Sequence, residues 1–324
     1  MKDCTEELGA FLKDYSDKHS FSFLREEPRA FASRLCEIFS VFFLSYDEST
    51  FMDGLKEKAL YCLWNNVIDD IIEYSSKGKD NILDCLEVLA GFRSGGTFNK
   101  RTETGQIIHD FMMRFHELPS GLNKEISEDL VFLDLMRILN GFDYERIVHE
   151  NDGIGTFSEY MEFGAITADL RVFLDIDLAT YPKKLTLSTI GDLREAYSRF
   201  DMAIKISSDI ATFEREYFTE LSQNAVILYG QKENLMPRNI LSAEQTQKEQ
   251  FLEDVIPSIV NDIEKKGKEY LSESIKYLER VNEIDTRHIS KAFKSMFEKY
   301  PGQRTFSPAH QKEHDSEGLE TGSL

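Results

Sequence analysis

Residues 189–218, TIGDLREAYSRFDMAIKISSDIATFEREYF, show most clearly how this chain folds. The stretch contains no proline, and its apolar residues recur at intervals of three and four. That spacing places them on one face of an α-helix. A long amphipathic helix is therefore predicted here, and the same spacing recurs along most of the chain.

The composition also favours an all-α fold. Of the 324 residues, 41% are hydrophobic, including 24 Phe and 13 Tyr, which is enough for a sizeable core. Glycine (18) and proline (7) are few, and no internal repeat or Pro/Gly/Ser-rich linker divides the chain. We expect a single helical-bundle domain over residues 1–305 and a disordered polar tail over residues 306–324.

About ten helices are predicted within that domain. In Thr156 and Glu159 we identify a capping box at the start of one helix, and Pro257 predicts a kink or break inside another. The expected helical segments are 26–44, 47–76, 80–92, 104–118, 124–151, 156–179, 189–218, 224–230, 243–279 and 286–299.

The charge and the cysteines exclude several classes of protein. A formal net charge of −20, from 38 basic and 58 acidic residues, repels nucleic acid and anionic membranes. An anionic substrate would need local cations or metal ions. The four cysteines show no CxxC spacing, so we expect reduced thiols rather than a zinc site or a disulfide framework. No apolar run of about eighteen residues and no signal-type N-terminus occurs, which predicts a cytoplasmic protein without stable membrane insertion.

A first candidate ligand set lies inside the opening stretch. Residues four apart share a helix face, so Ser208, Thr212 and Glu216 project their oxygens in one direction. Two hydroxyls and a carboxylate suit a hard cation such as Mg²⁺, and Arg215 could reach a phosphate bound to that cation. The alternative is a solvated polar stripe.

A second candidate set lies in WNNVIDDIIEY, residues 64–74. Asp69 and Glu73 are four apart and Asp70 is adjacent, on a helix whose neighbouring residues are largely apolar. Buried carboxylates are unfavourable unless they are paired or bind metal. A helix cap or a surface stripe is the alternative for this set, since acidic residues are common in the chain.

Together the two sets resemble the paired motifs of class I terpene cyclases. That family carries DDxx(D/E) on one helix and (N/D)Dxx(S/T)xxxE on a later helix, which here read DDIIE (69–73) and SDIATFERE (208–216). QNAVILYG (223–230) resembles the stretch that follows the second motif, and HENDGIGTFSEYMEF (149–163) resembles the segment before the family's diphosphate-sensing arginine. The resemblance covers about residues 60–230, and the length fits single-domain microbial members.

The resemblance implies the class I terpenoid synthase fold and a carbon–oxygen lyase. Its reaction is the Mg²⁺-dependent ionisation of a C15 or C20 prenyl diphosphate and cyclisation to a terpene hydrocarbon or alcohol. Three Mg²⁺ ions are implied, neutralising the departing diphosphate. The implied metal ligands are Asp69, Glu73, Ser208, Thr212 and Glu216. The implied catalytic residues are Asp69, Asp70, Arg171 and Arg215.

Some positions depart from the family. Ser208 replaces the usual Asn or Asp, and the position of the sensor arginine is Gly164. Arg171, seven residues further and about 10 Å along nearly the same face, is the candidate substitute, unless it pairs with an acidic neighbour. Arg304 is the candidate for the family's C-terminal Arg–Tyr pair, although Tyr300 precedes it.

Further substrate contacts are expected from basic and aromatic side chains near the motifs. Lys205, Arg146 and Arg304 join Arg171 and Arg215 as candidate phosphate ligands, with surface ion pairs as the alternative. A dry pocket for the hydrocarbon needs aromatic faces that stabilise cations, with core packing as the alternative. The candidate aromatic residues are Trp64, Phe142, Tyr160, Phe163 and Phe173.

Two other functions stay open at this point. A chain-elongating or condensing prenyl synthase would share the fold and bind prenyl diphosphate, but it would normally carry two aspartate-rich motifs. A helical scaffold protein, descended from a cyclase that lost activity through Ser208 and Gly164, is the non-enzymatic alternative. The substrate chain length, the product and the oligomeric state stay open, with a homodimer among the options.

Overall fold

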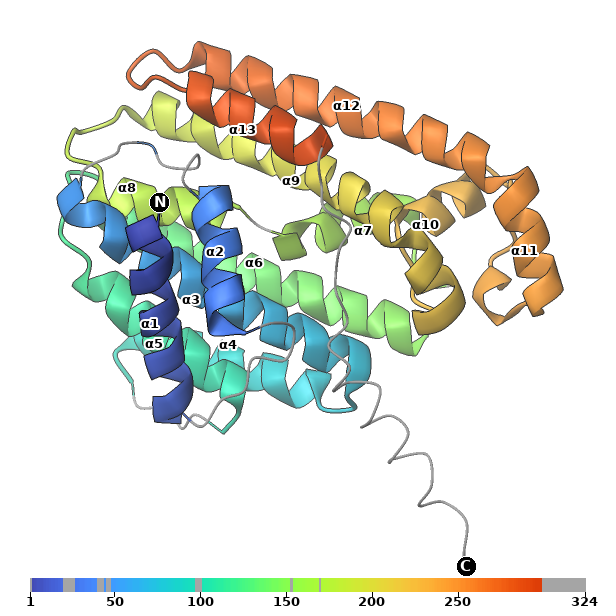
Figure 1. Ribbon diagram of the computed structural model, residues 1–324, viewed down its shortest axis with the longest axis horizontal. Helices are drawn as coiled ribbons and strands as arrows, with labels where there is room; N and C mark the ends of the chain where they lie inside the picture. Colours follow the sequence, from blue (N-terminus) through green and yellow to red (C-terminus); the bar gives the residue numbers. More distant parts are fainter. Residues whose placement is uncertain are drawn as a thin grey trace, which may run out of the picture. The chain divides into compact units, whose positions relative to one another are not determined.

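The computed structural model describes residues 2–19, 27–39, 44, 48–96, 101–151, 154–168 and 170–298. The regular secondary structure of these residues is helical throughout and includes no strand, which confirms the predicted all-α class (Figure 1). The α-helices are α1 (Lys2–His19), α2 (Pro28–Phe39), α3 (Glu48–Tyr74), α4 (Gly78–Ser94), α5 (Glu103–Glu117), α6 (Lys124–Glu150), α7 (Phe157–Phe163), α8 (Arg171–Thr180), α9 (Leu187–Arg215), α10 (Ala225–Lys232), α11 (Gln245–Asp254), α12 (Ile256–Arg280) and α13 (Arg287–Glu298). Three short helices are η1 (Gly164–Ala168), the π turn η2 (Glu216–Glu220) and η3 (Ile240–Ser242).

These thirteen α-helices exceed the ten segments expected, for three reasons. The segment 156–179 divides into α7, η1 and α8. The segment 243–279 divides at Val255, where Pro257 occupies the first turn of α12, as its missing N–H favours. α1 was not among the expected segments at all, because its sequence is charged in every turn.

The chain divides into two compact units, and the described part of the first consists of α1 and α2. Leu8 and Leu12 of α1, and Phe31 and Leu35 of α2, are buried. All four cysteines are free, and the Sγ atoms of Cys4 and Cys36 lie 2.7 Å apart. The second unit, which we call the main unit, contains α3 to α13.

Helix α3 lies at the centre of the main unit. Its Tyr61 ring contacts Phe111 of α5 and Phe173 of α8, with centroid distances of 6.2 and 5.3 Å. Its Trp64 ring meets Phe142 of α6 edge-on at 6.3 Å. Because α3 is buried on most of its faces, a polar side chain on it needs a partner inside the protein.

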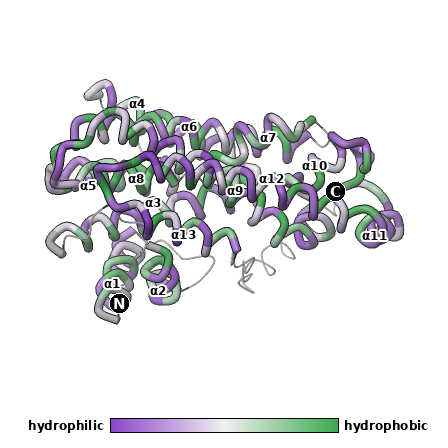
Figure 2. Tube along the Cα trace, turned by 90° about the horizontal axis from the view of Figure 1, so that it is seen from above, coloured by the Kyte–Doolittle hydropathy of each residue, from purple (hydrophilic) through white to green (hydrophobic). Residues whose placement is uncertain are grey.

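Helices α9 and α12 pack along each other in opposite directions (Figure 1). Ser274 of α12 donates a hydrogen bond to the carbonyl of Ala196, and a Cβ at Gly267 would lie 3.2 Å from Ile206, further along α9. Hydrophilic and hydrophobic residues interleave along both helices, as expected of helices that bury one face (Figure 2). The long helix predicted from the opening stretch is thus a principal element of the main unit.

The break between α7 and α8 places backbone groups beside α6. Thr156 accepts a hydrogen bond from the Glu159 N–H at 3.3 Å, which confirms it as the N-cap, and its hydroxyl donates to the Glu159 carboxylate at 2.9 Å, whereas in a capping box the N-cap backbone N–H is the donor. A Cβ at Gly141 of α6 would lie 2.7 Å from the Phe163 carbonyl oxygen. Only glycine lets α6 approach η1 this closely.

Among the helices described, none is long and apolar enough to span a membrane.

Candidate functional site

The first predicted ligand set lies near the C-terminal end of α3. Asp70 is 7% exposed and Asp69 is half-buried, while the neighbouring Ile68 and Ile72 are buried. The Glu73 side chain lies outside the described part of the chain. Both aspartates are therefore largely shielded from solvent, unlike residues on a solvated face.

The second predicted set lies where α9 passes into the π turn η2. The Thr212 hydroxyl donates to the Ser208 carbonyl at 3.0 Å, and Thr212 lies one helical turn before Glu216. Oε2 of Glu216 accepts a hydrogen bond from Asn224 at 2.9 Å, and Oε1 lies 3.5 Å from an Arg215 nitrogen. The three predicted residues thus share one face of α9, and Glu216 ends it.

Between the two sets lies a group of four side chains that we call the Lys205 cluster: Lys205, Glu145, Tyr160 and Asp209. The Lys205 ammonium donates to Glu145 Oε1 at 3.0 Å and lies 3.9 Å from Asp209 Oδ1. The Tyr160 hydroxyl donates to Asp209 Oδ2 at 2.7 Å, and the Ala225 N–H donates to the same oxygen at 2.8 Å. The cluster therefore joins α6, α7, α9 and α10.

Charge and burial act on every member of this cluster. Burial alone would lower the pKa of Lys205, but Glu145, Tyr160 and Asp209 raise it well above its usual value. Burial raises the pKa of Glu145 and of Asp209, and Lys205 opposes both shifts. Burial, followed by the charge of Asp209, raises the pKa of Glu216. One ammonium group is thus shared among several carboxylates.

The cluster also connects the two ligand sets. The negative charge of Asp69 contributes to the raised pKa of Glu145, after burial, and hydrogen bonds link α3 to the cluster. Thr167 of η1 donates to Glu145 Oε1 at 3.2 Å, and the Asn65 side chain of α3 donates to the Thr167 carbonyl at 2.7 Å. Asp69 and Glu216 therefore interact electrostatically with the same buried network from two different helices.

Gly164, the position of the family's sensor arginine, lies beside this network. A Cβ at Gly164 would lie 3.2 Å from the Tyr160 ring and 3.5 Å from Glu145 Oε1. A side chain at this position would therefore start over the carboxylate that Lys205 contacts. The backbone φ of −69° is helical, so other residues are compatible with it.

Arg171, the candidate substitute, lies in a different part of the main unit. It is 4% exposed, and its guanidinium lies 3.6 Å from Asp134 of α6. Arg194 of α9 holds the same carboxylate through two hydrogen bonds of 2.7 and 2.9 Å. Along α9, Arg194 precedes Ser208 by about 21 Å. The structure therefore places Arg171 beside an acidic neighbour, the alternative that the sequence left open.

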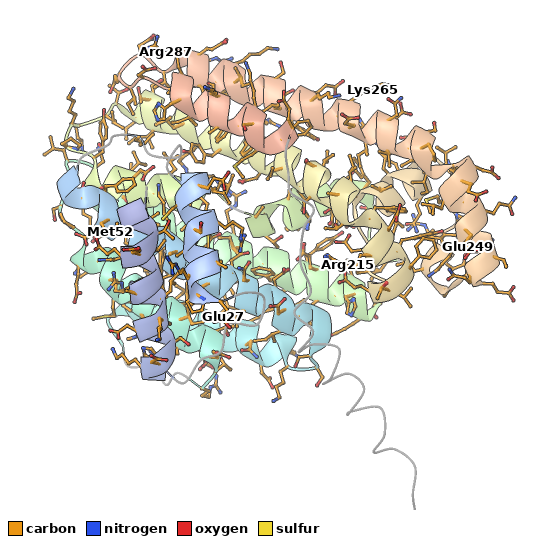
Figure 3. The ribbon with its side chains drawn as sticks, in the orientation of Figure 1. Glu27, Met52, Arg215, Glu249, Lys265 and Arg287 are labelled. Atoms are coloured by element: carbon orange, nitrogen blue, oxygen red, sulfur yellow. The ribbon has the colours of Figure 1, made fainter. Side chains whose placement is uncertain are left out.

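The other candidate phosphate ligands are paired as well. Arg215, labelled in Figure 3, contacts Glu216 and also Glu220 at 2.9 Å. Arg146 binds Asp143 and Glu150 within α6, both at 2.7 Å. Arg304 and Tyr300 lie outside the described residues.

Four of the five candidate aromatic residues lie on helices that contribute to the site, and Phe173 packs elsewhere. Trp64 and Phe142 form an edge-on pair that lies about one helical turn from Asp69 and Glu145. The Tyr160 ring lies under the Lys205 ammonium at 5.2 Å, and Phe163 contacts Tyr144. Phe173 packs against Tyr61 instead.

Sequence reasoning gave no part in this site to Glu145 and Asn224, and it did not identify Asp209 as a neighbour of Lys205. Asp209 was available as an i, i+4 partner of Lys205, and Asn224 caps α10 by accepting from the Val226 and Ile227 N–H groups. Glu145 carried no comparable signal, because its partner Lys205 is 60 residues away along the chain.

The α9 set fits one hard cation by its chemistry. The Thr212 oxygen keeps its lone pairs after donating to a carbonyl, Ser208 is half-buried, and Glu216 Oε1 makes only the 3.5 Å contact. Among the described residues, no group of three or more His, Cys, Asp or Glu side chains is placed to hold a metal ion. A cation here would therefore rely on hydroxyl oxygens beside Glu216.

No family model matches this chain, and a search of curated proteins finds no match. The terpene-cyclase resemblance therefore stays a prediction that rests on its two motifs.

Proposed function

We propose that the main unit binds a C15 or C20 prenyl diphosphate and ionises and cyclises it to a terpene hydrocarbon or alcohol, releasing diphosphate. The observation that carries this proposal is the chain of polar contacts between the two motif helices, which runs from Asn65 of α3 through Thr167 and Glu145 to Lys205 of α9. Two motifs that are more than a hundred residues apart contribute to one partly buried polar network. A solvated stripe and a helix cap would have no reason to be coupled in this way.

The polar end of the site would hold the diphosphate. Asp69, Ser208, Thr212 and Glu216 would hold divalent cations, with Asp70 and Glu73 beside Asp69. Bound Mg²⁺ would neutralise the charge that develops on the leaving diphosphate. Lys205 and Arg215 bring positive charge to the same end of α9, which a protein with a net charge of −20 needs in order to hold an anion.

The apolar half of the substrate would lie toward Trp64 and Phe142. Their rings offer π faces without a nucleophile, which suits an allylic cation. Phe142 lies about one turn before Glu145 on α6, and its ring meets that of Trp64 edge-on. Tyr160 holds Asp209 through its hydroxyl and presents its ring to Lys205.

Incubation of the purified protein with C10, C15, C20 and C25 prenyl diphosphates and Mg²⁺ tests this proposal. We expect a hydrocarbon or alcohol in the organic extract, identified by gas chromatography and mass spectrometry. Absence of any product, together with absence of Mg²⁺-dependent diphosphate binding, would refute it.

Removing one ligand from each motif tests the assignment of the cation site. Asp69→Ala and Glu216→Ala are each expected to lower turnover at least about a hundredfold, because each removes a carboxylate that holds positive charge at the leaving group. The helical circular dichroism signal should stay unchanged. Exposed Glu249 on α11, labelled in Figure 3, provides the matched control, Glu249→Ala, which should keep full activity. A fully active Asp69→Ala or Glu216→Ala variant would contradict the assignment.

Diphosphate binding without cyclisation is the second candidate function. Trp64 and Phe142 are both 0% exposed, which is the burial expected of core residues. Mg²⁺-dependent binding of a prenyl diphosphate without product would favour this candidate. A cytoplasmic location and homodimer formation stay predictions.

A further inference from the structure

We propose that Lys205 is a diphosphate-binding residue that replaces one divalent cation of this site. This inference rests on the proposed function and identifies a cation that the chain itself supplies. The site would therefore need fewer than three Mg²⁺ ions, because one positive charge between the two ligand sets is already built in.

The position of the Lys205 ammonium group is the first argument. Glu145 accepts one of its N–H groups at 3.0 Å, and the ammonium lies over the Tyr160 ring, 5.2 Å from the ring centroid. Asp209, at 3.9 Å, is beyond hydrogen-bond distance. The Lys205 side chain is 18% exposed, and an ammonium has three N–H donors, so we assign an N–H not held by Glu145 to an oxygen of a ligand.

The charges around Lys205 are the second argument. It faces Glu145 of α6 and Asp209 of its own helix, and Glu216 and Asp69 lie close enough to contribute to the same electrostatic network. Lys205 is the cation that contacts Glu145 and Asp209, and Arg215 lies beside Glu216. A divalent cation is the ordinary way to balance such carboxylates, and at Glu145 and Asp209 the chain supplies the positive charge itself.

The neighbouring glycine is the third argument. A Cβ at Gly164 would lie 3.5 Å from the Glu145 oxygen that Lys205 contacts. With no side chain at position 164, the space over this carboxylate is left to the ammonium group from α9. The positively charged side chain beside Glu145 thus comes from Lys205 of α9, whereas position 164 of η1 carries no side chain.

Two substitutions that change the charge of the cluster in opposite directions test the proposal on the full-length protein. Lys205→Met removes the positive charge, and Glu145→Gln removes a negative charge at the same point. Calorimetry with inorganic diphosphate in the presence of a chelator measures anion binding without metal. Electron paramagnetic resonance of Mn²⁺, with no diphosphate present, measures cation binding separately.

We expect Lys205→Met to bind inorganic diphosphate at least tenfold more weakly and Mn²⁺ at least tenfold more tightly than the wild type. Glu145→Gln should do the reverse, with tighter diphosphate and weaker Mn²⁺ binding. Loss of packing alone would weaken both ligands together. Lys205→Arg, which keeps the charge, should stay close to the wild type in both measurements.

Lys265→Met is the matched control. Lys265 pairs with Asp262 on the exposed side of α12 at 2.9 Å, so its replacement removes the same charge away from the site (Figure 3). It should change neither isotherm.

Three outcomes would overturn the proposal. These are wild-type affinities for both ligands in Lys205→Met, an unchanged diphosphate affinity in Glu145→Gln, and no metal-free diphosphate binding by the wild type. The Glu145→Gln measurement decides the question alone if Lys205→Met does not fold. Failure to turn over prenyl diphosphates would refute the proposed function, whereas none of these binding measurements uses a prenyl chain.

Discussion

Lys58 and Lys205 are both held inside the main unit by carboxylates, but their charge environments differ. Lys58 of α3 lies 2.6 Å from Asp177 of α8, and the two side chains are 0% and 3% exposed. Lys205 and Glu145 lie 3.0 Å apart, and each is 18% exposed. The first pair is sealed in the core, and the second reaches solvent.

The difference lies in the balance of charge and in access. Beside Lys58, Glu57 has its own cation, Arg114 at 2.6 Å, so each anion there has a partner. Lys205 lies among carboxylates that outnumber it. A balanced and sealed pair serves the fold, whereas an unbalanced and accessible one can take up an ion.

The largest expected effect concerns the sealed pair. Lys58→Met leaves Asp177 buried without its cation, which costs about 3–5 kcal/mol in the free energy of unfolding. Lys205→Met should cost less, about 1–2 kcal/mol, because water and cations reach its partners. Urea unfolding followed by circular dichroism measures both.

Addition of Mg²⁺ sharpens this comparison. It should restore most of the stability lost in Lys205→Met and none of that lost in Lys58→Met, because no ion reaches the sealed pair. Equal stabilisation of the two variants by Mg²⁺ would remove the distinction between the pairs.

The sequence predicted the helices, but it did not predict the difference between the Lys58 and Lys205 ion pairs. The break at Pro257 and the Thr156 cap follow from local chemistry, because proline lacks an N–H and threonine can accept from the first turn. α1 was missed because its short apolar stripe, including Leu8 and Leu12, lies among charged residues. Local rules therefore identify helix ends, and they fail where burial depends on a neighbouring helix.

The candidate site shows the same limit. Ser208, Thr212 and Glu216 were identifiable because helical spacing puts them on one face. Glu145 was not, because its relation to Lys205 arises from the packing of α6 against α9. The spacing argument that favoured Arg171 counted helical turns across residues 164–171, where the structure changes from η1 to α8.

The next expected effect concerns Arg171. Arg171→Met should lower the free energy of unfolding by about 2 kcal/mol, since it removes a buried charge from the Asp134 pair while Arg194 still holds that carboxylate. Diphosphate affinity should stay unchanged, because Arg171 shares Asp134 with Arg194, which lies about 21 Å along α9 from Ser208. A fall in diphosphate affinity at unchanged stability would instead make Arg171 the sensor.

Moving the positive charge from position 205 to position 164 tests whether diphosphate binding needs a positive charge beside Glu145 or needs Lys205 in particular. In the Lys205→Met background, Gly164→Lys should regain several-fold of the lost diphosphate affinity, about 1 kcal/mol, because a side chain there starts 3.5 Å from Glu145 Oε1. Gly164→Met is the matched control without charge and should regain nothing. Equal recovery by both would show that filling space, and not charge, is what the site lacks.

The smallest expected effect is a pH dependence confined to the sealed region. Burial, opposed by Arg114, raises the pKa of Glu57 to about 7, and Glu57 Oε2 has no hydrogen-bond partner among the described residues. The folded state therefore keeps a proton that the unfolded state releases near its ordinary, lower pKa, so stability is lost as the pH rises through about 7. Between about pH 6.5 and about pH 8 the free energy of unfolding should fall by about 1 kcal/mol on this account. Glu57→Gln, which cannot titrate, should remove that part of the slope in urea titrations at each pH. If the variant keeps the wild-type slope, then Glu57 is ionised throughout this range and the region around Lys58 holds one more charge than we infer.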